Sequence, residues 1–309
     1  MNTAAKIYSA GSREEWLSAR GRRIGGSTIA AIMGYDKYRT PYQVWKDLTG
    51  RSSNENLNDN KFVIAGHRLE QVVAEYFAHE TGFSIIESSK EDTLYTHPEY
   101  DFIVASPDRM YINENGKYCV LECKTTQNTV DDLPLSWYCQ LQWYLMITGC
   151  DEGSIAWLSR GVDFGCRQFY ANVDFQQELL RVAVEFWNKN VMTDTVPDFV
   201  NSSDIESYYQ ETTDGVVEAD DFLLNAHNAL LDIKAEIKRL EERERQLSEA
   251  VKLRLRDNET VSYFGKRLFT WKQSSRISVD TKRLKIEKPD VWHDYSKEST
   301  VRTFLVKEA

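Results

Sequence analysis

Apolar residues recur at helical spacing in two segments of the first half of the chain. Over residues 66–81 they lie three or four positions apart, and Gly82 follows as a stop signal. Residues 134–148 show a second pattern of this kind, which Gly149 ends. We therefore expect one helix in each segment.

Two short apolar runs between these helices are typical of a pair of β-strands. Residues 103–105 form the first run and residues 118–121 the second. The residues at positions 113–116, Asn-Glu-Asn-Gly, have a composition that suits the turn of a hairpin. We expect the two runs to belong to antiparallel strands joined by this turn.

The register of that hairpin decides which charged residues meet. We expect Ile112 to pair with Lys117 across the turn. In that register Asp108 lies opposite Leu121, one position away from Glu122. Two carboxylates would then lie close together at the end of a buried hairpin.

A third charged residue, Lys124, follows Glu122 after one intervening position. Side chains two apart on a strand share one face, at a spacing of roughly 6–7 Å. Charged groups are rarely placed in a buried strand unless they are paired or bound to a metal. Together with Pro107-Asp108, the pair indicates either a salt bridge at a strand end or a metal-dependent phosphodiesterase site.

This arrangement resembles the PD-(D/E)xK nuclease superfamily, and within it the YqaJ-like viral recombinase group that includes the lambda exonuclease. The resemblance implies an α/β (α+β) fold: a restriction-endonuclease-like core whose central mixed sheet is flanked by helices. It also implies that Asp108 and Glu122 hold Mg²⁺, for which Mn²⁺ can substitute, and that Lys124 is catalytic. Glu70, which stands in a Gly-x-x-x-Glu context, corresponds to a further carboxylate near the metal.

The helix expected at 134–148 adds two candidates, Gln140 and Tyr144. They are four residues apart and so share one helix face. A Gln-x-x-x-Tyr helix after the Glu-x-Lys strand resembles the third motif of RecB-type nucleases. That resemblance makes Gln140 a catalytic candidate and Tyr144 a candidate DNA contact, although Tyr144 also fits a stripe of core residues.

The N-terminal segment resembles the lambda-type exonucleases more specifically. Trp16 and Arg20 form a Trp-x-x-x-Arg pattern, and Ser27 follows seven residues later. By this resemblance Arg20 and Ser27 hold the 5′ phosphate of a DNA end, and Arg23 contacts DNA. We also expect Ser27 to cap a helix over residues 28–33. A capped turn with solvated arginines is the alternative.

The charge distribution limits where DNA would bind. The 309-residue chain has a formal net charge of −10, yet residues 1–50 carry eight Lys and Arg against four Asp and Glu. Residues 252–288 carry eleven against four, and there Lys266 and Arg267 lie among aromatic residues in an expected hairpin. These ends indicate localised phosphate contacts, with Lys266 and Arg267 as candidates, rather than general polyanion binding.

Composition excludes several other classes of protein. With 41% hydrophobic and 28% charged residues, the chain is typical of a globular protein, and no apolar run reaches the length of a membrane span. Its five cysteines lack C-x-x-C spacing, so we expect reduced thiols and a cytoplasmic location. The histidines lack the spacing of common zinc sites.

Three regions are expected along the chain. Residues 1–200 would form the nuclease core, residues 201–220 an acidic linker, and residues 221–309 a long helix followed by a basic hairpin. The long helix carries two apolar rows at heptad spacing over about four heptads. It would therefore pack against another helix or an oligomer partner, or lie on the core as an amphipathic helix.

The resemblance implies an exonuclease that hydrolyses linear double-stranded DNA in the 5′-to-3′ direction during phage-type recombination. It further implies a single-strand annealing protein as partner, a homo-oligomeric ring, and a phage or prophage origin in a bacterial host cell. An endonuclease or nickase on the same core is the alternative, because both reactions use the same catalytic residues. A non-catalytic DNA-binding protein is the remaining alternative function.

Overall fold

The computed structural model contains two compact units, Met1–Tyr208 and Tyr209–Ala309, which are considered separately. The structure describes residues 6–9, 15, 21–52, 61–86, 93–298 and 301–307.

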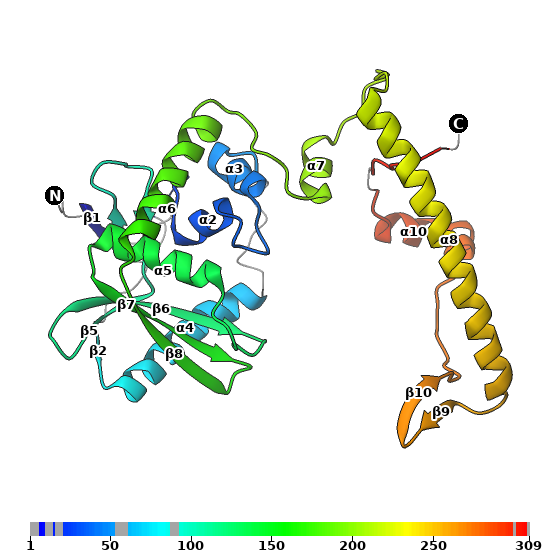
Figure 1. The fold of residues 1–309 in the computed structure, drawn as a ribbon, viewed down its shortest axis with the longest axis horizontal. Helices are drawn as coiled ribbons and strands as arrows, with labels where there is room; N and C mark the ends of the chain where they lie inside the picture. Colours follow the sequence, from blue (N-terminus) through cyan, green and yellow to red (C-terminus); the bar gives the residue numbers. More distant parts are fainter. Residues whose placement is uncertain are drawn as a thin grey trace. The chain divides into compact units, whose positions relative to one another are not determined.

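The first unit is built around a five-stranded mixed sheet (Figure 1). Strands β6 and β7 run parallel, and every other neighbouring pair in this sheet is antiparallel. The connection between the two parallel strands is a helix, as parallel neighbours require. In spatial order the strands are β2 (Ser84–Ile86), β5 (Arg109–Ile112), β6 (Tyr118–Thr126), β7 (Glu152–Ser159) and β8 (Asp163–Tyr170).

A second, three-stranded sheet lies beside the first in the chain's N-terminal part. Its strands in spatial order are β1 (Lys6–Ser9), β3 (Thr93–Thr96) and β4 (Val104–Ala105). An isolated parallel bridge joins Ile24 to Ile103, next to β4. The indole of Trp143 donates a hydrogen bond of 2.9 Å to the Val104 carbonyl, which fixes β4 against a helix of the core.

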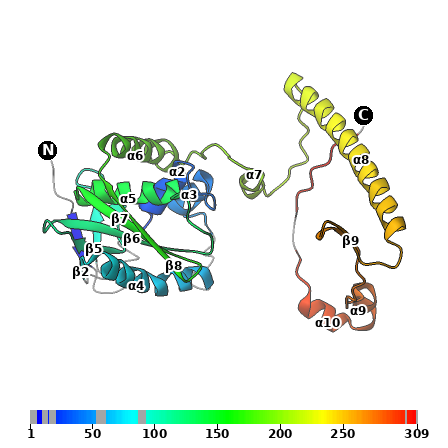
Figure 2. The ribbon, with the colours of Figure 1, turned by 60° about the horizontal axis from the view of Figure 1, so that its bottom comes forward.

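Helices cover both faces of the five-stranded sheet (Figure 2). Helix α4 (Lys61–Thr81) packs on one face, and α5 (Leu135–Thr148) on the other. Helices α2 (Gly26–Ile32) and α6 (Val173–Phe186) pack on α5, and α3 (Pro41–Thr49) packs on α2. Helix α6 continues as a π-helical turn, η2 (Trp187–Val191). The central mixed sheet flanked by helices, predicted from the sequence, is therefore confirmed.

The two helices expected near the site form with the predicted ends. Gly82 and Gly149 both have left-handed backbone, with φ of +72° and +74°, and both follow the last helical residue. Helix α4 begins at Lys61, five residues earlier than expected. Helix α5 is apolar around most of its circumference because it lies between the sheet and the outer helices.

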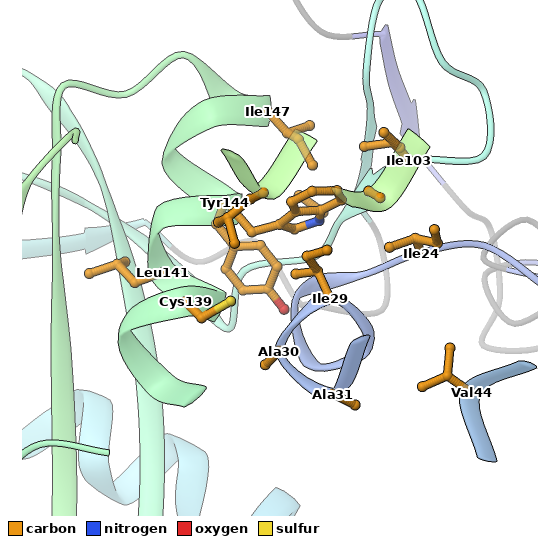
Figure 3. Packing of buried hydrophobic residues seen from close by; sticks show 14 of the residues in the cluster. Ile24, Ile29, Ala30, Ala31, Val44, Ile103, Cys139, Leu141, Tyr144 and Ile147 are labelled. Carbon is orange, nitrogen blue, oxygen red and sulfur yellow. The ribbon is translucent and has the colours of Figure 1, made fainter. Parts of the chain in front are cut away.

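Two apolar clusters form the core, one on each side of the sheet. The larger contains buried side chains of α2, α3, α5 and α6, and Figure 3 shows part of it, with Tyr144 projecting from α5 toward α2. The smaller lies under α4 and includes Phe77, Tyr111 and Leu121. Neighbouring positions of β6 point to opposite clusters, which follows from the two-residue period of a strand.

The segment expected to start the linker is helical instead. Helix α7 (Ser202–Tyr208) belongs to the first unit. Its Asp204 is 1% exposed and accepts a hydrogen bond of 3.0 Å from Thr40 Oγ1. The ring of Tyr208 lies 6.1 Å from that of Tyr42 on α3. These contacts extend the first unit to Tyr208, because Asp204, one of the acidic residues of that segment, is a buried partner of Thr40.

The second unit contains the long helix and the hairpin that the sequence predicted. Phe264 and Gly265 form the hairpin turn with φ of +46° and +77°, a geometry that Gly at the second position favours. Within the described residues, no helix is both long enough and apolar enough to cross a membrane. The elements are α8 (Asp221–Leu255), β9 (Thr260–Tyr263), β10 (Lys266–Thr270), α9 (Thr281–Glu287) and α10 (Pro289–Tyr295).

Candidate active site

The turn of the β5–β6 hairpin sets the register of its acidic residues. Ile112 pairs with Tyr118 and not with Lys117, so the expected register was wrong by one residue. The Asn113 side chain explains the difference, because its Oδ1 accepts hydrogen bonds of 2.9 Å from the backbone N–H groups of Asn115 and Lys117. This side chain holds a longer turn than the Asn-Glu-Asn-Gly composition alone suggested.

The corrected register brings the two carboxylates closer together. Arg109 pairs with Leu121, so Asp108 lies beside Glu122. Asp108 Oδ2 accepts a hydrogen bond of 2.8 Å from the backbone N–H of Cys123, which fixes the carboxylate against β6. Asp108 is 2% exposed and Glu122 is 1% exposed. Two buried carboxylates side by side, one on β6 and one just before β5, need cationic neighbours or a bound cation.

Lys124 supplies one such neighbour. Its Nζ lies 2.7 Å from Glu122 Oε1 and donates a hydrogen bond of 2.8 Å to Gln140 Oε1. The Lys124 side chain is 21% exposed, so the ammonium group is held by two partners at the edge of solvent. The structure thus brings together Asp108, Glu122, Lys124 and Gln140, the four residues that the sequence proposed as catalytic.

Two contacts position Gln140 on helix α5: a hydrogen bond to Tyr144 and a close approach to α2. Gln140 Nε2 donates a hydrogen bond of 2.9 Å to the Tyr144 hydroxyl, so the two share a helix face as predicted. A Cβ atom at Gly26 would lie 2.6 Å from Gln140 Cγ and 2.7 Å from Tyr144 Cε1. Gly26 therefore lets α2 pack against the side chains of α5. Tyr144 is 5% exposed and serves as core and support for Gln140.

Glu70 lies on α4, the helix that packs against β6. Its Oε1 is 3.1 Å from His67 Nδ1, one helical turn earlier. Burial raises the pKa of the Cys123 thiol well above its usual value, and the charges of Asp108, Glu122 and Glu70 raise it further, whereas Arg109 lowers it. All three carboxylates therefore act on the thiol of this buried residue of β6.

The donor set suits a hard divalent cation. Asp108 and Glu122 offer carboxylate oxygens, and Mg²⁺ is commonly held by one or two carboxylates while it keeps several waters. Among the described residues, no three His, Cys, Asp or Glu side chains are already gathered as a metal cage. Carboxylate oxygens suit Mg²⁺ better than Zn²⁺, whose structural sites are built mainly from Cys and His side chains.

A pocket of about 470 Å³ opens beside Lys124 and Gln140. Ser27 lines it as well, so the structure places Ser27 in one cavity with two catalytic candidates. The pocket also contains residues that were not among the predicted site residues. Tyr38 is 81% exposed, and its ring lies 4.9 Å from Lys37 Nζ. The further lining residues include Tyr35, Thr125, Asn128 and Trp137. Only their position next to the site identifies them, because their sequence spacing also fits core and loop positions.

The predicted capping role of Ser27 was wrong. Helix α2 begins at Gly26 with Gly25 as its N-cap, and no side chain caps it. Ser27 lies inside the first turn with its side chain exposed, because Gly25 adopts the extended cap conformation that Ser27 was expected to take. Trp16 and Arg20 lie outside the described residues, so the phosphate-binding role of Arg20 stays a prediction.

Of the remaining candidate DNA contacts, Arg23 lies in the first unit, and Lys266 and Arg267 lie in the second. Arg23 lines a different pocket, of about 460 Å³, together with Lys6 and Asp101. Lys266 and Arg267 lie on β10 in the second unit, where they pair with Tyr263 and Ser262 of β9, and both are exposed. The structure therefore places Arg23 at a different pocket from the one that Lys124 and Gln140 line.

Comparison with known proteins agrees with the motifs at this site. The YqaJ-like viral recombinase domain matches residues 15–151. Uncharacterized protein YqaJ of Bacillus subtilis (strain 168) is 30% identical over 312 residues, which cover 96% of this chain and 95% of that protein. The matched domain contains Glu70, Asp108, Glu122, Lys124 and Gln140.

Two solved structures also resemble the chain. One is an alkaline exonuclease from Laribacter hongkongensis, with a TM-score of 0.45 and 18% identity over 59% of this chain and 94% of that one. The other is a phage related exonuclease from Haemophilus somnus 129PT, with a TM-score of 0.38 and 14% identity over 56% of this chain and 96% of that one. On the strength of the domain match and the 30% identity over nearly its whole length, the chain belongs to the YqaJ-like viral recombinase family.

Proposed function

We propose that this protein is a Mg²⁺-dependent deoxyribonuclease that degrades linear double-stranded DNA from its ends in the 5′-to-3′ direction. One observation carries the proposal. Lys124 Nζ lies between Glu122 Oε1 and Gln140 Oε1, at 2.7 and 2.8 Å, beside a second buried carboxylate, Asp108. A structural salt bridge would need only one carboxylate and would leave Gln140 without a reason to be held there.

Each side chain has a distinct role in phosphodiester hydrolysis. A divalent cation, when bound, lowers the pKa of water and offsets the negative charge that develops on the phosphate. Asp108 and Glu122 would hold that cation, with Glu70 contributing from α4. Mn²⁺ could substitute for Mg²⁺ at this site. Lys124 orients the attacking water or balances charge on the phosphate oxygens. Gln140 fixes the ammonium group of Lys124 and is itself fixed by Tyr144.

The pocket beside Lys124 supports binding of a DNA end. Ser27 lines that pocket, and Arg20 belongs to the same N-terminal motif. We assign to these two residues the capture of a terminal 5′ phosphate, which would set the register of cleavage. Arg23, Lys266 and Arg267 would contact the DNA backbone elsewhere, consistent with the basic character of residues 1–50 and 252–288.

The biological setting proposed here is phage-type homologous recombination in the cytoplasm of a bacterial host. The family is one of viral recombinases, and an enzyme that digests one strand of a duplex leaves a single strand behind. A single-strand annealing protein is therefore the expected partner.

One digestion experiment tests the activity. The protein is incubated with Mg²⁺ and three duplexes: a linear DNA with 5′-phosphate ends, the same DNA with 5′-hydroxyl ends, and a closed circle. The proposal expects digestion of the linear DNA alone, faster from phosphate ends. Cutting of the circle would identify an endonuclease and remove the role of Arg20 and Ser27. A complete lack of cleavage in Mg²⁺ or Mn²⁺ would leave only a DNA-binding role.

A further inference from the structure

Helix α8 of the second unit carries an apolar face that is exposed in the single chain. Two rows of apolar residues at heptad spacing follow the helix, one including Leu230 and Ile237 and the other Ile233, Leu240 and Leu247. Ile233, Ile237, Leu240 and Leu247 are 54%, 49%, 51% and 62% exposed. The C-terminal segment of the chain reaches α8 near His227, whose Nε2 lies 2.8 Å from the Lys307 carbonyl oxygen. The middle of the face is open to solvent.

A second α8 in antiparallel orientation fits the open middle of this face. In antiparallel helix pairs, each residue of one row packs against a residue of the other row on the facing helix. If the two-fold axis passes between residues 238 and 239, the helices overlap almost completely, because α8 spans Asp221–Leu255. The layers are then Ile237 on the partner's Leu240, Ile233 on the partner's Glu244, Leu230 on the partner's Leu247, and Ala226 on the partner's Val251, each repeated by symmetry.

Charges beside the apolar rows match in the same register. Glu236 faces the partner's Arg243, and Lys234 faces the partner's Glu241, so every charged pair along the flanks joins opposite signs. The polar interruption at Glu244 falls beside the partner's Lys234. Residues flanking an apolar seam choose both the partner and the orientation in such helix pairs. The charge pattern of one chain is therefore complementary to itself.

A parallel pair would join like charges instead. Glu236 would then face the partner's Glu241 on both sides of the seam, and Glu244 would meet the partner's Glu244 inside it. We propose that α8 is a self-association surface, and that two copies of this chain pair through α8 in antiparallel orientation about a two-fold axis. This pairing differs from the ring that the family resemblance implies, and it does not depend on nuclease activity.

The mass of the full chain in solution tests the pairing. We expect an even number of chains, by light scattering coupled to size exclusion. Ile237→Asp places a charge in the seam and should halve the mass. Ala235→Asp introduces the same side chain on the outer face of the same helix and should leave the mass unchanged, with circular dichroism confirming helix content in both. A monomeric wild-type chain, or an unchanged mass for Ile237→Asp, would overturn the proposal.

Charge exchange provides a test that a folding defect cannot imitate. The variant Lys234→Glu/Arg243→Glu has only acidic flanks, and the variant Glu236→Lys/Glu241→Lys has only basic ones. Each variant alone should lose at least half its mass, and an equal mixture should recover the wild-type mass as a mixed pair. A mixture that stays dissociated would contradict pairing through these flanks.

The orientation is tested by cross-linking in a Cys166→Ser background, which removes the exposed native thiol. One chain carries Ala229→Cys and the other carries Ala250→Cys. The antiparallel register places these positions across from each other, so a short bis-maleimide should join the two chains. In a parallel pair they would be about 31 Å apart along the helix axis, and no cross-link between them would form. That second result would exclude the antiparallel arrangement.

Discussion

Replacing Gly26 by alanine tests how the catalytic lysine is held. An Ala in place of Gly inside a helix usually stabilises a protein by about 0.5–1 kcal/mol. Here the new Cβ would lie 2.6 Å from Gln140 Cγ, whereas non-bonded carbon atoms pack at about 3.5–4.0 Å. The Gln140 side chain must therefore retreat by roughly 1 Å, and we expect Gly26→Ala to destabilise the fold by about 1–3 kcal/mol through overpacking.

The same displacement reaches Lys124. Gln140 Oε1 accepts the 2.8 Å hydrogen bond from Lys124 Nζ, and lengthening it by about 1 Å takes it beyond the hydrogen-bonding range. Lys124 would keep its Glu122 partner but lose the second contact that fixes its direction. A catalytic group displaced by about 1 Å costs on the order of 100-fold in rate. We expect that loss in the cleavage step and little change in DNA affinity.

The assay is single-turnover cleavage of linear duplex DNA in saturating Mg²⁺, at a temperature where both proteins are folded. Denaturant unfolding gives the change in stability. Gly66→Ala on α4 is the matched control for stability, because a Cβ there would lie 3.9 Å from Thr125 Oγ1, an ordinary contact. A Gly26→Ala protein that is more stable than wild type and cleaves at the wild-type rate would refute the reasoning.

Three further predictions concern other parts of the first unit. Lys124→Ala should keep the fold and metal binding but lower the single-turnover rate by about 10²–10⁴-fold; near-normal turnover would remove Lys124 from the mechanism. Arg20→Ala should selectively slow digestion of 5′-phosphorylated ends, and an equal loss on all ends would argue against a phosphate anchor. Burial raises the pKa of the Cys119 and Cys139 thiols to about 12, while in the unfolded chain they ionise near pH 9. The contribution of these two thiols to stability should therefore be constant below about pH 9 and be lost between pH 9 and 12, and Cys139→Ala should reduce that slope in denaturant titrations at several pH values.

The catalytic cluster could be predicted because its residues lie on regular elements. A strand places Glu122 and Lys124 on one face, and a helix places Gln140 and Tyr144 on one face, whatever the rest of the fold does. Hydrogen bonds and ion pairs at these positions agree with both expectations. The position of Asp108 was harder to predict, because it depends on a turn whose length is set by the side-chain hydrogen bonds of Asn113.

Features that depend on contacts between distant segments could not be predicted. The close neighbours of Gly26 are Gln140 and Tyr144 on α5, far away in the sequence. Residues 201–220 were expected to form an acidic linker, yet Asp204 is buried against Thr40. In both cases the local sequence fits several environments, and only tertiary packing selects one.

The central claim is that Glu122 acts in metal-dependent cleavage rather than as a structural partner of Lys124. Glu122→Gln keeps the size of a side chain that is 1% exposed, and it removes the negative charge. The decisive measurement is the single-turnover rate of this variant on linear duplex DNA in Mg²⁺, together with its DNA affinity. The account predicts that binding persists while cleavage is lost. Cleavage at the wild-type rate by Glu122→Gln would contradict it.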